Sequence, residues 1–127
     1  MRLHLQGGIL ALLDALVVVL TFGSEAYAQS VRIVAIGASN TAGQGVGQSA
    51  AWPAQLEAML RAKGVNAEVI NAGISGDSSC GMLARVDSAA PSGTAVVILQ
   101  RPGFNDLRSG CEGTERNMQC GLLIPSG

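Results

Sequence analysis

The segment covering residues 31–47, which reads VRIVAIGASNTAGQGVG, constrains the fold of this chain most strongly. Its first six residues are apolar apart from Arg32 and rich in β-branched side chains, and they are followed by Gly37. This pattern predicts a buried strand closed by a tight turn. Ser39 follows two residues after Gly37, at the edge where open α/β sheets place their ligands. On this stretch alone, a serine that only caps a helix or a turn is the more common interpretation.

Strands and helices alternate along the rest of the chain. Residues 65–71 and 94–100 are predicted strands, and the second of these is apolar throughout, as interior strands of parallel sheets are. Helices are predicted over residues 54–63 and 81–88, and residues 112–119 could begin another. Alternation of this kind indicates an α/β protein with right-handed crossovers and helices on both faces of a parallel sheet.

The first predicted helix carries signals at both ends. Ser49 is a suitable N-cap, Pro53 suits a first helical turn and Gly64 is a C-terminal stop. Trp52 shares the helical spacing of the apolar positions, so we expect it in the core rather than at a binding site.

Residues 1–28 have the pattern of a secretory signal peptide. Arg2 supplies the positive start, residues 8–20 are apolar, and Ala26-Tyr27-Ala28 is a small-x-small cleavage site. A transmembrane helix is the weaker alternative, because the apolar run is short and contains Asp14. We therefore expect cleavage after Ala28, a periplasmic or secreted product without a stable membrane anchor, and one domain over residues 29–127.

Charge and composition exclude several classes of function. The formal net charge is −1 and no Lys/Arg cluster occurs, so nucleic acids and anionic membranes have no basic surface to bind. His4 is the single histidine, and it lies in the predicted signal peptide. No zinc-binding Cys/His spacing exists, and we expect no metal site.

The three cysteines are Cys80, Cys111 and Cys120. Export permits disulfides. Cys111 and Cys120 close a short loop and are the expected pair, which leaves Cys80 as a free thiol.

Each predicted strand is followed by a loop that carries a group useful in acyl transfer. The loops read GASNTAG from Gly37, NAGISGDSS from Asn71 and PGFND from Pro102. They offer the hydroxyl of Ser39, a backbone N–H at Gly76 that no Cβ shields, and the side-chain amide of Asn105. Because parallel strands end at one edge of a sheet, these groups should gather there, and fixed amide donors of this kind stabilise a tetrahedral oxyanion.

These blocks resemble the SGNH hydrolases, also called GDSL esterases, and especially the exported bacterial acyl-CoA thioesterase, arylesterase and lysophospholipase group. The matching text is IVAIGASNTAGQGVG…AWPAQLEAML, VINAGISGDSS…GMLARVD and VVILQ…PGFNDLRSG, which spans roughly residues 31–110. The resemblance implies an α/β/α sandwich of three layers with a flavodoxin-like parallel sheet and the first strand in its centre. It also implies a hydrolase of acyl esters, thioesters or lysophospholipids that needs no metal or organic cofactor.

The same resemblance implies roles for three residues. Ser39 would be the nucleophile, and the backbone N–H groups of Ser39 and Gly76 with the Asn105 side chain would form the oxyanion hole. The chain departs from the family pattern at Ala38 and Asn40, which flank the serine in place of Asp and Leu. In the third block Phe104 replaces a glycine and Arg101 looks inserted, and either change could displace the Asn105 amide.

The largest departure concerns the family's final Asp-x-x-His block, which supplies the general base and the residue that orients it. Neither position has a match here, so the resemblance implies a domain whose C-terminal part is missing and a strand at 96–99 that becomes an open edge able to self-associate. An exported, non-catalytic protein that binds a small molecule or an acyl group is the alternative. Nucleotide binding is disfavoured, since Gly43-x-Gly45-x-Gly47 is not G-x-G-x-x-G and no Gly-Lys-Ser/Thr occurs.

Overall fold

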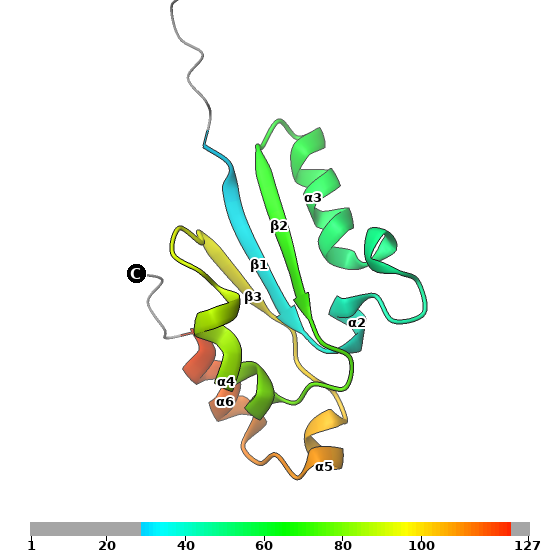
Figure 1. Ribbon diagram of the computed structural model, residues 1–127, viewed down its shortest axis with the longest axis vertical. Helices are drawn as coiled ribbons and strands as arrows, with labels where there is room; N and C mark the ends of the chain where they lie inside the picture. The colour runs from blue at the N-terminus through cyan, green and yellow to red at the C-terminus, as the bar shows by residue number, and fades with distance from the viewer. Residues whose placement is uncertain (1–28, 123–127) are drawn as a thin grey trace, which may run out of the picture.

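The computed structural model describes residues 29–122 (Figure 1). The predicted signal peptide therefore lies outside the described residues. The described elements follow in chain order: β1 (Val31–Gly37), α2 (Ser39–Ala42), the 3₁₀ helix η1 (Gln48–Ala50), α3 (Trp52–Ala62), β2 (Ala67–Gly73), α4 (Ser79–Ala89), β3 (Val96–Leu99), α5 (Asn105–Ser109) and α6 (Thr114–Leu122).

The three strands form one parallel sheet in the order β2-β1-β3, with β1 in the centre (Figure 1). Pairing between β1 and β2 runs from Val31 opposite Ala67 to Gly37 opposite Gly73. On the other side, Ile33 of β1 lies opposite Val96. The predicted α/β class, the parallel sheet and the central place of the first strand are confirmed.

Alternate side chains of β1 face opposite layers of helices. Val34 and Ile36 are fully buried among Met82 and Val86 of α4, and Met118 of α6 packs against the same cluster. Ile33 and Ala35 pack with residues of α3 on the other face, including Trp52 and Leu56. The prediction of helices on both faces is confirmed, and so is the core position of Trp52.

The start of α3 differs from the prediction. Ser49 lies inside the 3₁₀ helix η1, and the N-cap of α3 is Ala51, whose backbone is extended at φ −68° and ψ 154°. The Ser49 cap was therefore wrong, because the chain makes a separate short turn before it enters the helix. Pro53 does lie in the first turn of α3, and Gly64 adopts a left-handed conformation just after its end.

Strand pairing shifts the other predicted boundaries. The second strand begins at Ala67 rather than residue 65, because the Val65 N–H donates a hydrogen bond to the Leu60 carbonyl near the end of α3. It continues to Gly73, since its ladder with β1 extends that far. The third strand is shorter than predicted and the last helix starts at Thr114. Sequence patterns missed the short helices α2 and α5.

Within residues 29–122, none of the helices has the length and apolar character needed to cross a membrane.

Candidate active site

Backbone hydrogen bonds join the loops that follow the three strands at the carboxyl edge of the sheet. The Ile74 N–H donates to the carbonyl of Gly37 at 3.0 Å, and the Gln100 N–H donates to the carbonyl of Ile36 at 2.8 Å. The end of β1 is therefore fixed to the loop after β2 on one side and to the loop after β3 on the other. This arrangement confirms that the three loops gather at one edge, as expected for parallel strands.

Ser39 is the first residue of α2 and is half-buried. The helix is a single turn that ends at Ala42, and the N–H of its C-cap residue Gly43 donates to the Ser39 carbonyl at 3.0 Å. A turn this short is not stable by itself and needs contacts with the rest of the fold. Ser39 therefore depends on its surroundings for its position.

Thr41 supplies those contacts from beneath α2, where it is completely buried. Its hydroxyl donates to the Gln100 side chain and accepts from the Trp52 indole N–H at 3.3 Å. Its carbonyl accepts from the Asn71 side-chain amide at 2.7 Å. One buried residue thus connects the serine's helix to the ends of β2 and β3 and to α3.

Two glycines allow α2 to approach the sheet closely. A Cβ at Gly73 would lie 2.3 Å from the Ala42 nitrogen, and a Cβ at Gly37 would lie 2.0 Å from the Thr41 hydroxyl. Neither distance is compatible with a side chain, so any larger residue would push α2 away from the strand ends.

Gly76 lies in a turn of the β2–α4 loop, in which the Asp77 N–H donates to the Ile74 carbonyl at 3.1 Å. Its φ of 82° is in the left-handed region, which favours glycine. A Cβ there would meet no atom within 4 Å, so the backbone conformation rather than space explains the glycine.

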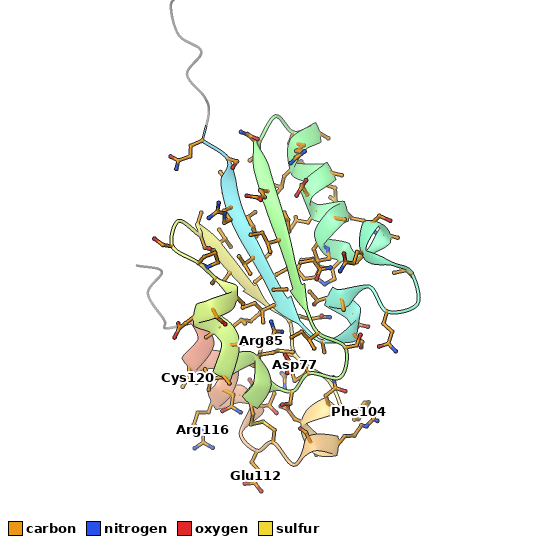
Figure 2. All side chains as sticks on the ribbon, in the orientation of Figure 1. Asp77, Arg85, Phe104, Glu112, Arg116 and Cys120 are labelled. Carbon is orange, nitrogen blue, oxygen red and sulfur yellow. A yellow bond between two sulfur atoms is a disulfide. The ribbon has the colours of Figure 1, made fainter. Side chains whose placement is uncertain are left out.

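Asn105 is the first residue of α5 and is half-buried. Its side-chain amide donates to the carbonyl of Asp77 at 2.9 Å, which places it beside the Gly76 turn. The preceding Phe104, which replaces the family's glycine, is 80% exposed at the outer end of this region (Figure 2). Arg101 forms an exposed ion pair with Glu115 at 2.7 Å.

Gly76 and Asn105 line one surface pocket of about 250 Å³ together with Arg108 and Ser109. The structure therefore brings together two of the three predicted oxyanion donors, Gly76 and Asn105. Ser39 is not among the residues that line this pocket. Sequence patterns did not single out Arg108 and Ser109, because the PGFND motif does not indicate that the last residues of α5 line the pocket.

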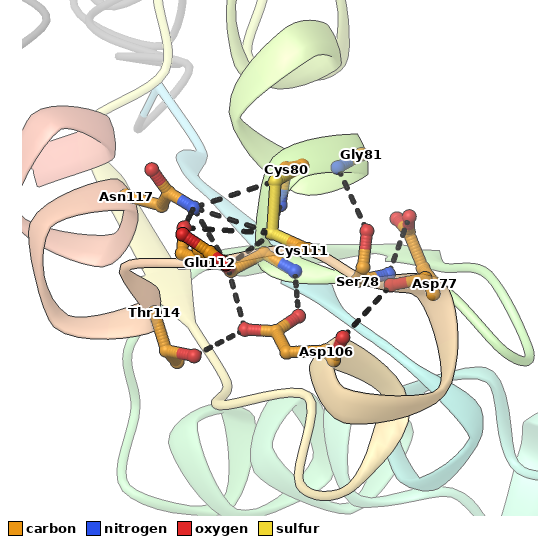
Figure 3. Close-up of a disulfide and its surroundings, with 11 residues drawn as sticks. Asp77, Ser78, Cys80, Gly81, Asp106, Cys111, Glu112, Thr114 and Asn117 are labelled. Atoms are coloured by element: carbon orange, nitrogen blue, oxygen red, sulfur yellow. Dashed lines mark hydrogen bonds between the residues drawn. A yellow bond between two sulfur atoms is a disulfide. The ribbon is translucent and has the colours of Figure 1, made fainter.

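Asp106, the residue after Asn105, is a buried carboxylate at 4% exposure (Figure 3). Its two oxygens accept from the Ser79 N–H at 2.6 Å, from the Ser79 hydroxyl at 2.7 Å and from the Thr114 hydroxyl. Burial by itself raises the pKa of Asp106, but the hydrogen bonds from Thr114 and Ser79, with the charge of Arg101, outweigh it and hold the pKa below its ordinary value of 3.8. Asp106 thus joins α5 to the start of α4 and to α6.

A disulfide between Cys80 and Cys111 lies next to this carboxylate (Figure 3). The expected pair Cys111–Cys120 was wrong: Cys120 is an exposed free thiol on α6. The reason is spatial: the Cys111 N–H donates to the Asp106 carbonyl at 2.9 Å, and the Asp106 carboxylate accepts from the Ser79 N–H at the start of α4, so Cys111 lies beside the first turn of that helix. Proximity in sequence therefore did not predict proximity in space.

The chain is similar to several esterases, among them TesA and AlinE4. "Esterase TesA" of Pseudomonas aeruginosa is 38% identical over 109 residues, which are 85% of this chain and 50% of that protein. The crystal structure of AlinE4, an SGNH-hydrolase family esterase, is 35% identical with a TM-score of 0.65, over 74% of this chain and 52% of that one. A crystal structure of TesA is 30% identical with a TM-score of 0.57, over 71% and 51% of the two chains.

This chain spans about half the length of these relatives. The model of the GDSL-like Lipase/Acylhydrolase family matches residues 35–120, which include all three loops of the site. On this match and on the identity to the relatives, the chain belongs to the GDSL-like lipase/acylhydrolase family.

Proposed function

We propose that this chain carries the nucleophile and the oxyanion-binding groups of a serine ester hydrolase of the SGNH type. Ser39 is the nucleophile, and the backbone N–H groups of Ser39 and Gly76 with the Asn105 side-chain amide receive the oxyanion. As a general base takes the hydroxyl proton of Ser39, the serine oxygen forms a bond to the ester carbonyl carbon, and the carbonyl oxygen takes the negative charge; the base then returns the proton to the leaving group. Collapse of this intermediate expels the alcohol or thiol and leaves an acyl-serine, which water hydrolyses.

One observation carries this proposal: the hydrogen bond from the Asn105 amide to the Asp77 carbonyl, which sets Asn105 beside the Gly76 turn. Oxyanion donors must be fixed before the reaction, since donors that reorganise during the reaction stabilise the transition state less. The pocket shared by Gly76 and Asn105 supports the same interpretation.

The substrates we propose are acyl esters, thioesters or lysophospholipids, all of which present a carbonyl carbon to Ser39. We also propose export, with cleavage after Ala28, to the periplasm or the outside of the cell. N-terminal sequencing of the extracytoplasmic product should then begin at Gln29. An intact Met1 on a cytoplasmic product would contradict export.

Serine needs a general base, and such a base typically contributes about 10²–10⁴-fold to the rate. The single histidine of the printed sequence is His4. We therefore expect negligible turnover from this chain by itself. This observation also favours the second candidate, an exported protein that binds an acyl group or a small molecule without hydrolysing it.

Hydrolysis of p-nitrophenyl butyrate, with and without added imidazole, separates the two candidates. If Ser39 is the nucleophile, imidazole should act as an external base and produce turnover in excess of its own reaction with the ester. Ser39→Ala should abolish this excess, whereas Ser49→Ala, at an exposed serine in η1, should retain it. An equal rate in the Ser39→Ala variant would reject the hydrolase and favour the binding protein.

A further inference from the structure

We propose that Arg85 is a positioning residue that sets the geometry between the nucleophile's loop and the oxyanion donors. This inference rests on the proposed function. Arg85 projects from the middle of α4 toward the strand ends and meets Asp77 there (Figure 2). It is a charged side chain with only 20% exposure, which requires well-placed partners.

The guanidinium of Arg85 has partners on two of the three loops. Its Nε and Nη2 contact the Asp77 carboxylate at 2.9 and 2.8 Å, and Nη2 also donates to the Gly37 carbonyl at 3.4 Å. Gly37 stands two residues before Ser39, and Asp77 directly follows Gly76. One side chain therefore connects the nucleophile's loop with the loop that carries Gly76.

The connection continues to the third loop through the backbone of Asp77, whose carbonyl accepts the Asn105 amide. The Asp77 carboxylate is itself confined, because its second oxygen accepts the Ser78 N–H at 3.0 Å. A Cβ at Gly81 would lie 2.0 Å from that oxygen, so the first turn of α4 packs directly on the carboxylate. A movement of Arg85 would therefore be transmitted to Gly37, to the Gly76 turn and to Asn105.

Arg61 on α3 offers a matched control. It also bridges a carboxylate and a strand carbonyl, with Nη2 at 2.9 Å from Glu57 and Nε donating to the Ala67 carbonyl at 3.0 Å. Its bridge lies at the start of β2, at the opposite end of that strand from the site loops. Lysine replaces a single contact of arginine but not a fork across two groups. Arg85→Lys should keep the ion pair with Asp77 and lose the link to Gly37.

The test uses the full chain with Arg85→Lys, Arg61→Lys and Ser39→Ala, and it has two readouts. In ¹⁵N–¹H spectra, the Gly76 amide and the Asn105 side-chain amide should shift in Arg85→Lys, with hydrogen exchange accelerated about tenfold, while both stay unchanged in Arg61→Lys. The second readout is the dissociation constant for phenylboronic acid by ¹¹B NMR. The Ser39 oxygen bonds to boron, the hydroxyl proton goes to solvent, and the tetrahedral adduct occupies the oxyanion site.

If Arg85 positions the site, Arg85→Lys should weaken phenylboronic acid binding about tenfold and Arg61→Lys less than about twofold, at equal unfolding midpoints. Unchanged site amides and unchanged affinity in folded Arg85→Lys would overturn the inference, and so would a loss of stability alone. Absence of any Ser39-dependent boronate binding in the unmodified chain would count against the proposed function instead. The amide readout would then still decide whether Arg85 couples the three loops.

Discussion

The two outer strands of the sheet, β2 and β3, differ in the side-chain contacts that their backbones make. On the outer edge of β2, the Val69 N–H donates to the Glu57 carboxylate at 2.7 Å and the Ala67 carbonyl accepts from Arg61. On the other side of the sheet, Val96 of the outer strand β3 is 44% exposed. In the part of the chain that the structure describes, side chains of α3 thus bond to the outer edge of β2, whereas no further strand lies beside β3.

This difference determines whether each outer strand can pair with a strand of another molecule. An edge whose N–H and C=O groups are already bonded cannot template another strand, whereas an open apolar edge can. The β3 side is instead supported from one face by α6, where Met118 packs against the cluster that includes Val97 and Leu99. The Asp106 cluster and the Cys80–Cys111 disulfide hold the segment that leads into α6.

Loss of the disulfide should give the largest effect. It spans 31 residues of sequence, and Cys80→Ser/Cys111→Ser should lower the free energy of unfolding by about 3–4 kcal/mol. Hydrogen exchange should increase in α6 and β3 and remain unchanged on β2. Denaturant unfolding measures the first and exchange mass spectrometry the second. Cys120→Ser, at the exposed thiol, is the control, and an equal loss of stability there would mean that Cys120 forms the native disulfide.

Asp106→Ala should have the second largest effect. It should lower the free energy of unfolding by about 2–3 kcal/mol, because the Ser79 and Thr114 donors would lose their buried acceptor. The pKa of Asp106 is lower in the folded chain than its ordinary value of 3.8, so its stabilisation is present above that value and is lost as the pH falls through the folded pKa. The advantage of the unmodified chain over Asp106→Asn should therefore shrink below about pH 3.8. An advantage that stayed constant down to strongly acidic pH would contradict this linkage.

The open edge of β3 should cause self-association. We expect the unmodified chain to elute from size-exclusion columns in a concentration-dependent way. Val96→Lys should raise the dissociation constant about tenfold, which corresponds to about 1.4 kcal/mol, because a charge on an edge strand opposes pairing. A sharp monomer peak with cooperative unfolding for the unmodified chain would refute this expectation and favour a compact binding protein.

Glu57→Ala should have the smallest effect, about 1 kcal/mol in unfolding free energy, since its carboxylate is partly exposed and its bond to Val69 is partly replaced by water. It should also open the β2 edge and increase association. Glu68→Ala removes an exposed ion pair with Arg32 and serves as control, with a change within about 0.5 kcal/mol. If both variants behave alike, the edge bond of Glu57 contributes nothing and the contrast between the two edges disappears.

Much of the fold could be predicted because its signals are local. The apolar runs predicted three strands, and Pro53 and Gly64 predicted the extent of α3 to within a few residues. The candidate site was predicted only as a set of residues that should meet at one edge. Gly76 and Asn105 do meet in one pocket, but the bond from Asn105 to the Asp77 carbonyl has no sequence signal, because it joins residues 28 positions apart.

By itself, the sequence determined the alternation of strands and helices, the parallel sheet and the three loops with Ser39, Gly76 and Asn105, because periodicity and glycine conformation act over a few residues. Only the tertiary structure decided that Cys80 pairs with Cys111, that Arg85 reaches both Asp77 and Gly37, and that Glu57 bonds to the outer edge of β2. Such pairings depend on which distant segments packing brings within bonding distance, and a bond between distant residues leaves no pattern in the residues next to either partner.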